Sequence, residues 1–146
     1  MLYRPQHFHL TELVCKEVYD KFGDKSWLFL DEKIIITIDT IRRLLNKPIT
    51  INDWYEGGKF SQRGLRCNIC SIPKGKTIKD ELYMSAHCLG MAVDFNVEGL
   101  TEADIHLWIA VNKDKLPYNM RIENDTIGWV HLDCYNNGNK LTFFNA

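Results

Sequence analysis

Two short stretches in the second half of this chain alternate apolar and polar side chains, which is the pattern of a half-buried β-strand. In residues 91–97 (MAVDFNV) every second residue is apolar, and Asp94 lies on the other side. In residues 128–135 (GWVHLDCY) the apolar side alternates with a side that carries Trp129, His131 and Asp133. If these strands pair in one sheet, Asp94 and His131 emerge on the same face, because side chains alternate across a strand.

Helical periodicity marks three further segments, and each has a signal at one end or both. The predicted helices cover residues 11–22, ended by Gly23; residues 32–45, capped by Asp31 and stopped by Pro48; and residues 102–111, opened by Thr101 and Asp104 as a capping box. Strands are also predicted at 48–53, 119–123 and 140–144, with residues 136–139 (NNGN) as a hairpin turn, so that the C-terminal strands form an antiparallel meander. We therefore predict one α+β domain over residues 1–146, with a central antiparallel sheet and helices packed on one face.

Residues 54–84 are rich in glycine and polar side chains and are predicted to form loops that set specificity. Cys67 and Cys70 lie in this region with the spacing of half a zinc knuckle or of a redox pair. No second CxxC and no thioredoxin-like pattern accompanies them, so they are interpreted as loop cysteines. All five cysteines are expected to be reduced, because an odd number in a chain of this size argues against a disulfide framework.

Charge and composition exclude several classes of function. The net charge is −1 at pH 7 and no run of lysine or arginine forms a patch for a phosphate backbone, so nucleic acid is not expected as a partner. No apolar run is long enough to span a bilayer, and the first residues lack the basic and apolar regions of a signal peptide. The chain is therefore expected to be cytoplasmic when synthesised, without a membrane partner, and monomeric.

A metal site follows from the placing of three side chains. His87 precedes the strand that carries Asp94, and Gly90 between them permits a sharp bend that brings the imidazole towards the same face. With His131 this gives two histidines and a carboxylate with a free fourth position, which is the ligand set of a catalytic zinc. Zinc lowers the pKa of water and polarises a carbonyl, and hydrolysis also needs a carboxylate that shuttles the proton. On spacing alone, an ordinary hydrogen-bonded strand histidine remains the alternative.

The same residues belong to a longer motif, SxHxxGxAxD at residues 85–94, followed by WVH at residues 129–131. This combination resembles the zinc D-Ala-D-Ala carboxypeptidase and endolysin family, which shares its fold with the Hedgehog signalling domain, and especially its short phage members. The resemblance covers nearly the whole chain. It implies the Hedgehog/DD-peptidase fold and a zinc metallopeptidase that hydrolyses an amide bond in the peptide stems of peptidoglycan.

Carried over residue by residue, the resemblance also implies site residues. The implied zinc ligands are His87, Asp94 and His131. Ser85 matches the motif serine beside the substrate. Arg66 matches the family arginine that engages a substrate carboxylate or carbonyl, for which a planar fork of donors is suited, and Arg63 is the second choice. Trp129 is either a packing residue or a wall of the substrate site.

The general base departs from the family pattern. Many relatives carry Glu or Asp three residues before the last histidine, and this chain has Gly128 there. Glu123 is the preferred candidate, because it ends a predicted strand across the hairpin from His131 and a strand end holds a carboxylate firmly. Asp125 in the turn is the second candidate, or simply a turn former. Asp133 either orients the imidazole of His131 or serves as the acid itself.

Two other functions stay open. The missing acid at position 128 favours a non-catalytic zinc-binding module that binds protein or glycan on the same fold. A D-Ala-D-Ala dipeptidase would instead need a closed pocket that fits two residues. For the cell-wall enzyme, the expected partner is a peptidoglycan stem peptide, and the protein would act on the wall of its bacterial host after release, as phage lysis enzymes do.

Overall fold

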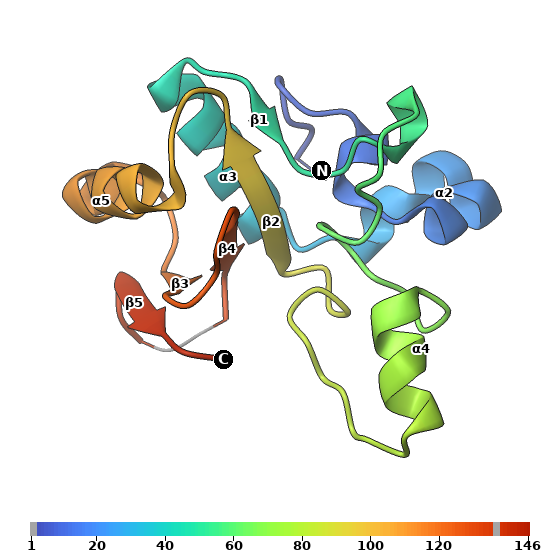
Figure 1. The fold of residues 1–146 in the computed structure, drawn as a ribbon. Coiled ribbons are helices and arrows are strands. Elements are labelled where there is room, and N and C mark those ends of the chain that lie inside the picture. The colour runs from blue at the N-terminus through green and yellow to red at the C-terminus, as the bar shows by residue number, and fades with distance from the viewer. Residues whose placement is uncertain (1–2, 136–137) are drawn as a thin grey trace.

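A five-stranded sheet forms the centre of the molecule (Figure 1). The computed structural model describes residues 3–135 and 138–146. The strands are β1 (Ile49–Thr50), β2 (Ala92–Val97), β3 (Met120–Glu123), β4 (Val130–Asp133) and β5 (Leu141–Phe144), in the spatial order β1-β2-β4-β3-β5. Neighbouring strands run antiparallel except β3 and β5. This mixed, mostly antiparallel arrangement is compatible with the predicted α+β class.

The predicted C-terminal meander is wrong in its last strand. β5 pairs with β3 and runs parallel to it, whereas the sequence pattern predicts a hairpin between β4 and β5. Both edges of β4 are occupied, one by β2 and one by β3, so β5 takes the outer edge of β3. Of the predicted NNGN turn, Asn136 and Asn137 lie outside the described residues.

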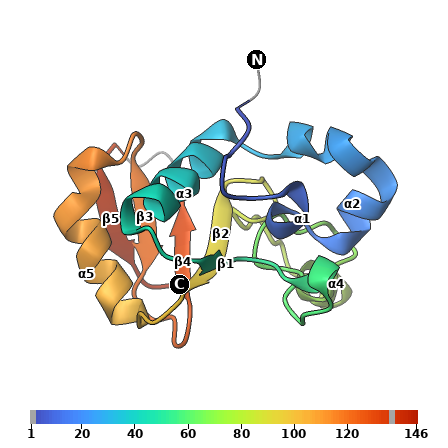
Figure 2. The same cartoon turned by 90° about the horizontal axis from the view of Figure 1, so that it is seen from above.

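Two helices, α3 (Glu32–Leu45) and α5 (Glu102–Asn112), cover one face of the sheet (Figure 2). The carboxylate of Asp31 accepts a hydrogen bond from the backbone N–H of Lys33, which confirms the predicted cap of α3. At the other end Asn46 adopts the left-handed conformation, with a φ of 51°, two residues before Pro48. The capping box of Thr101 opens α5 as predicted. Both helices turn isoleucine stripes towards the sheet: Ile34, Ile38, Ile41, Ile105 and Ile109.

The predicted helix over residues 11–22 is broken into α1 (Leu10–Leu13) and α2 (Lys16–Phe22). Val14 is extended instead and forms an isolated parallel bridge with Leu65. The backbone N–H of Leu65 donates to the carbonyl of Leu13, and that of Cys15 donates to the carbonyl of Leu65. A partner distant in the sequence therefore takes the hydrogen bonds that a continuous helix would have made, and this contact fixes the loop before Arg66.

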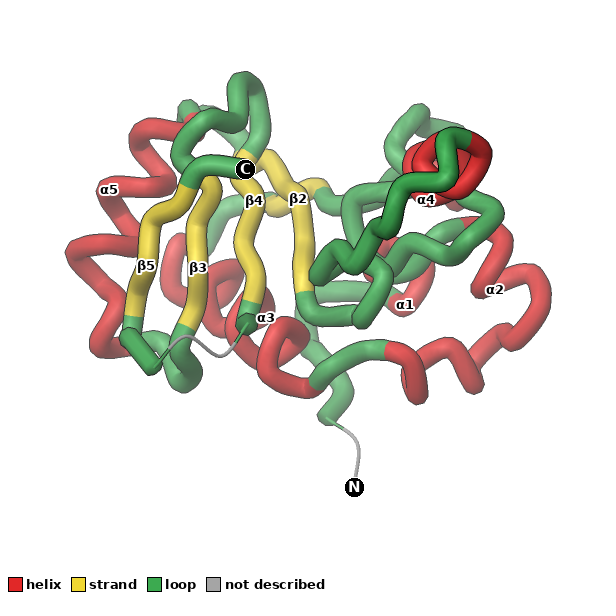
Figure 3. Tube along the Cα trace, turned by 90° about the horizontal axis from the view of Figure 1, so that it is seen from below, coloured by secondary structure: helices red, strands yellow, loops and turns green. Residues whose placement is uncertain are grey.

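The predicted loop region 54–84 contains a helix that the sequence pattern misses, α4 (Ser71–Ile78). Three short 3₁₀ helices complete the elements: η1 (Gly23–Phe29), η2 (Trp54–Glu56) and η3 (Lys113–Lys115). Figure 3 shows β2, β4, β3 and β5 side by side, with α3 and α5 behind them and α1, α2 and α4 beyond the edge of β2. The sheet face turned away from α3 and α5 is therefore left for a site.

The hydrophobic core lies between the sheet and its two covering helices, where Phe95, Ile122, Val130 and Leu132 are fully buried. The alternate residues of β2 and β4 carry the polar side chains of the opposite face, as the alternation predicts. Within the described residues, no helix is both long and apolar enough to cross a membrane.

Candidate metal centre

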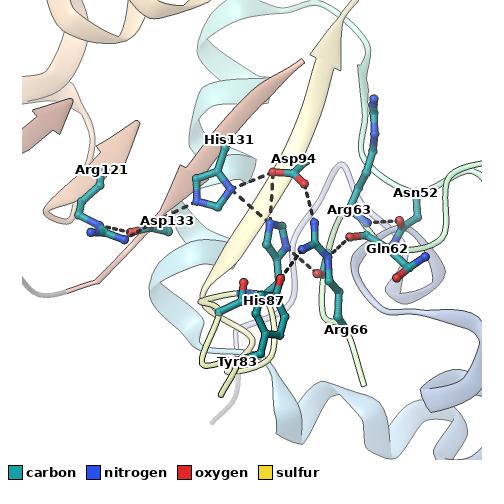
Figure 4. Close-up of polar contacts among 12 residues, drawn as sticks. Asn52, Gln62, Arg63, Arg66, Tyr83, His87, Asp94, Arg121, His131 and Asp133 are labelled. Atoms are coloured by element: carbon teal, nitrogen blue, oxygen red, sulfur yellow. Dashed lines mark hydrogen bonds and ion pairs between the residues drawn. The ribbon is translucent and has the colours of Figure 1, made fainter. Parts of the chain in front are cut away.

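Asp94 and His131 face each other directly across β2 and β4. His87 reaches the same point from the turn that precedes β2, where Gly90 has a φ of 68° and its backbone packs against the carbonyl of Phe29. A Cβ at Gly90 would lie 2.0 Å from that carbonyl oxygen, so only glycine fits this bend. The prediction that these three side chains come together is thus met by the geometry (Figure 4).

Three atoms of these side chains converge. His87 Nε2 lies 3.2 Å from Asp94 Oδ1 and 3.2 Å from His131 Nδ1, and His131 Nδ1 lies 2.9 Å from Asp94 Oδ1. Ligand atoms at about 2.0–2.2 Å from a tetrahedral zinc are themselves roughly 3.3 Å apart. The spacing of the three atoms therefore fits a zinc coordination shell, and all three side chains are buried.

The outer contacts of the two imidazoles determine which nitrogen of each ring carries the proton. His87 Nδ1 lies 2.8 Å from the carbonyl oxygen of Gly64, which only accepts, so Nδ1 donates and Nε2 keeps its lone pair. His131 Nε2 lies 3.0 Å from the Asp133 carboxylate, so Nε2 donates and Nδ1 keeps its lone pair. Two nitrogen lone pairs and a carboxylate oxygen then point at one spot. These atoms repel one another unless a cation lies between them.

In the absence of a metal, a proton takes the place of that cation. Burial lowers the pKa of His131, but its hydrogen bonds with Asp133 and Asp94 outweigh burial and raise the pKa to about 9. Burial dominates at His87 and lowers its pKa. Metal binding must therefore displace a proton from His131.

Arg66 holds the second oxygen of the Asp94 carboxylate. Its Nη2 donates to Asp94 Oδ2 at 2.9 Å, and its Nη1 donates to the hydroxyl of Tyr83 at 3.0 Å. A third nitrogen, Nε, donates to the carbonyl of Gln62. The side chain predicted to bind substrate thus lies at the site, where it fixes the orientation of a metal ligand (Figure 4).

Asp133 is completely buried and orients His131 from the other side. Both of its oxygens accept from Arg121, each at 2.8 Å, and Oδ2 also lies 3.0 Å from His131 Nε2. The backbone N–H of Tyr135 donates to Oδ1 as well. With both oxygens engaged, Asp133 fits the predicted orienting role, and the alternative role as the acid has no free oxygen to use.

Glu123 lies at the rim of the same site. The register of β3 against β4 pairs Ile122 with Leu132, and its continuation places Glu123 opposite His131, as predicted. A cavity of about 370 Å³ contains Glu123, all three candidate ligands, Ser85 and Trp129 in its lining. Burial raises the pKa of Glu123, which favours proton transfer near neutral pH.

The remaining predicted site residues are Ser85, Arg63 and Asp125, and they have different surroundings. The hydroxyl of Ser85 accepts from the backbone N–H of His87 and so stabilises the turn that carries this residue. Arg63 lines a second cavity of about 310 Å³, donates to Asn96 and stacks on Phe60. Asp125 is exposed, accepts from the backbone N–H of Ala146 and does not line either cavity.

Three contributors at the site were not found from the sequence. The carbonyl of Gly64 and the hydroxyl of Tyr83 come from the predicted loop region, and no local pattern marks them. Arg121 could have been found from the sequence, because the predicted hairpin of β3 and β4 places it on the polar face opposite Asp133.

Comparisons with protein-family models, curated proteins and solved structures yield no match to this chain. The case for a function therefore depends on the geometry of the site and on the motif resemblance.

Proposed function

We propose that this protein is a zinc-dependent peptidase of the Hedgehog/DD-peptidase fold that hydrolyses an amide bond in peptidoglycan stem peptides. The observation that carries the proposal is the convergence of three buried lone-pair atoms, from His87, Asp94 and His131, at one end of a cavity that also contains a carboxylate. The motif resemblance supplies the substrate class. Such an enzyme would act on the bacterial wall after release from the cell in which it is made.

When bound by two imidazoles and one carboxylate, zinc supplies Lewis acidity, which activates water and polarises a carbonyl. The chain itself supplies orientation. Gly64 and Asp133 fix the two imidazole tautomers, and Arg66 fixes the carboxylate of Asp94. These contacts hold the ligand atoms in place before the substrate arrives, so no reorganisation is needed during the reaction.

Glu123 is the group proposed to move the proton. It would take a proton from the attacking water and deliver it to the leaving nitrogen of the cleaved amide. The carboxylate is only partly buried and lines the same cavity as the three candidate ligands. Asp133 and Asp125 are less suited, since the first has both oxygens engaged and the second lies outside the cavity.

The shape of the site favours an extended peptide over a free dipeptide. The cavity at the candidate ligands and the second cavity beside it share Arg66, Asp94 and Trp129 in their linings. The exposed indole of Trp129 thus lies between two adjoining hollows, where it forms a wall for a chain that runs through both. Arg63 lines the second cavity, where it would contact a part of the peptide outside the first cavity.

The test compares the release of new amino groups from purified peptidoglycan by the unaltered protein and by Glu123→Gln, with zinc content measured in both. We expect the variant to retain zinc and lose turnover. Asp125→Asn should retain zinc and most of the turnover, because Asp125 contributes to the raised pKa of Glu123 but does not line the cavity. Turnover by Glu123→Gln equal to that of the unaltered protein would exclude Glu123 as the general base.

A second candidate function is a zinc module that binds protein or glycan without turnover. The specific observation in its favour is Gly128, which stands at the position where the related peptidases carry an acid. Zinc binding without amine release from peptidoglycan by the unaltered protein would support this module and contradict the peptidase.

A further inference from the structure

A second group of metal-ligating side chains lies away from the site described above. Cys15, Glu17, Cys67 and Cys70 each offer a ligand atom, and these four atoms all lie within 4.8 Å of one another. Cys15 and Cys70 are buried, Cys67 is half-buried and Glu17 is exposed. All of these cysteines are free thiols. The sequence pattern shows only the CxxC half of this group, because its other half comes from a segment about fifty residues earlier.

Two distances within the group match the spacing of ligand atoms around zinc. The Sγ atoms of Cys67 and Cys70 lie 3.6 Å apart, and Cys70 Sγ lies 3.7 Å from Glu17 Oε2. Thiolates at about 2.3 Å from a tetrahedral zinc are themselves roughly 3.8 Å apart. The CxxC spacing is also the usual way in which one turn of chain supplies two thiolates to zinc.

We propose that Cys15, Glu17, Cys67 and Cys70 form a closed structural zinc site. Four protein ligands leave no open position, which is the property that separates a structural site from a catalytic one. Soft thiolates select zinc over magnesium and calcium, which prefer oxygen ligands. Three thiolates and one carboxylate also carry the same total charge as the common four-cysteine set.

The position of this second site indicates what it does. Cys15 joins the pairing of residues 13–15 with Leu65, and Cys67 and Cys70 lie two and five residues after Leu65. A metal there ties the start of α2 to the segment that ends at α4. That segment includes Gly64, which orients His87, and Arg66, which orients Asp94. The structural zinc therefore holds in place the residues that arrange the candidate ligands at the first centre.

The inference does not depend on peptidase activity, and its test uses spectroscopy of the purified full chain. Cobalt replaces zinc at both sites, and only thiolate–cobalt bonds give intense charge-transfer absorption in the near ultraviolet. We expect this absorption in the unaltered protein and in His131→Ala, and its loss in Cys67→Ser. Zinc content by mass spectrometry should be two per chain in the unaltered protein and one in each of these variants.

Cys88→Ser serves as the matched control, because Cys88 is also half-buried but lies outside the group. Both metal equivalents and the full absorption should persist in this variant. Absence of the thiolate–cobalt absorption from the unaltered protein would overturn the proposal, as would its persistence in Cys67→Ser. A disulfide between Cys67 and Cys70 in protein prepared without oxygen would overturn it too, since it would make the pair a redox couple. A lack of peptidase activity with two zinc ions bound would contradict the proposed function alone.

Discussion

The Nδ1 atom of His131 lies 2.9 Å from Oδ1 of Asp94, and the two residues are direct cross-strand partners in β4 and β2. Cross-strand pairs place side chains within reach of one another without a flexible connection. Two of the three candidate metal ligands are therefore fixed by the sheet itself. The third, His87, is fixed by a glycine-dependent turn and a buried hydrogen bond to Gly64.

Arg66→Ala should weaken zinc binding at this centre by about 10–100-fold, the usual loss when a residue that orients a ligand is removed. The reason is that Asp94 Oδ2 loses its donor at 2.9 Å. Competition with a chromophoric chelator measures the affinity in the full chain, and the same titration of His131→Ala identifies the part of the curve that belongs to the cysteine group. Arg63→Ala is the matched control, since the side chain of Arg63 donates its hydrogen bond to Asn96 and acts on the Asp94 carboxylate only through its charge. Equal losses in the two variants would show that the effect is not specific to Asp94.

Asp133→Asn should also lower zinc affinity by about 10–100-fold, because it removes the charged acceptor that holds the His131 tautomer. The proton on the ring would then be free to move to Nδ1 and block the ligand atom. Isothermal titration of the metal-free protein with zinc measures the change. If Asp133 were the catalytic acid instead, the variant would bind zinc normally and lose only turnover.

Gly64→Ala should destabilise the protein by about 1–3 kcal/mol, the usual cost of overpacking. A Cβ at position 64 would lie 2.1 Å from the carbonyl oxygen of Leu13, so the backbone must shift and carry the acceptor of His87 with it. Gly75→Ala in α4 is the control, because nothing lies within 4 Å of a Cβ there. Urea unfolding should show that this control is about 0.5–1 kcal/mol more stable than the unaltered protein, as for alanine in a helix.

Stability at low pH should depend on Asp39, which is remote from the metal centre. Burial on its own raises the pKa of Asp39, but hydrogen bonds from Tyr3 and His7 outweigh it and lower the pKa. A carboxylate with a lowered folded-state pKa stabilises the fold above its unfolded pKa and loses that contribution as pH falls through the folded value. The free energy of unfolding should therefore fall below about pH 4, where an unfolded aspartate titrates.

Asp39→Asn tests this dependence, and should reduce the slope of stability against pH in urea titrations. Asp20→Asn is the control, since Asp20 forms an exposed ion pair with Lys16, which contributes little to stability. An unchanged slope in Asp39→Asn would assign the acid sensitivity to other carboxylates.

The parts of the fold that follow from local patterns were predictable. α3 agrees with its prediction at both ends, because Asp31 and its isoleucine stripe are encoded within one stretch of chain. The break at Val14 was not predictable, since Leu10, Val14 and Val18 keep helical spacing across it and the competing partner, Leu65, is distant in sequence. α4 was missed because Pro73 and Gly75 lower its helix propensity.

The candidate site also has a part that was predictable from the sequence and a part that was not. Alternation in two strands placed Asp94 and His131 on one face, and the predicted hairpin placed Glu123 across from His131. Gly90 indicated the bend that delivers His87. The pairing of Arg66 with Asp94 depends on where a long loop folds back, which no local pattern encodes. The same reason applies to the cysteine group, because Cys15 meets Cys67 and Cys70 only through tertiary structure.

The most direct test of the central claim is an anomalous difference map of zinc-loaded crystals, with data collected on either side of the zinc absorption edge. We predict a peak within about 2.0–2.2 Å of His87 Nε2, His131 Nδ1 and one carboxylate oxygen of Asp94, the usual zinc–ligand distances. No peak among these three residues, or a peak bound through His131 Nε2, would contradict the assignment of the metal centre.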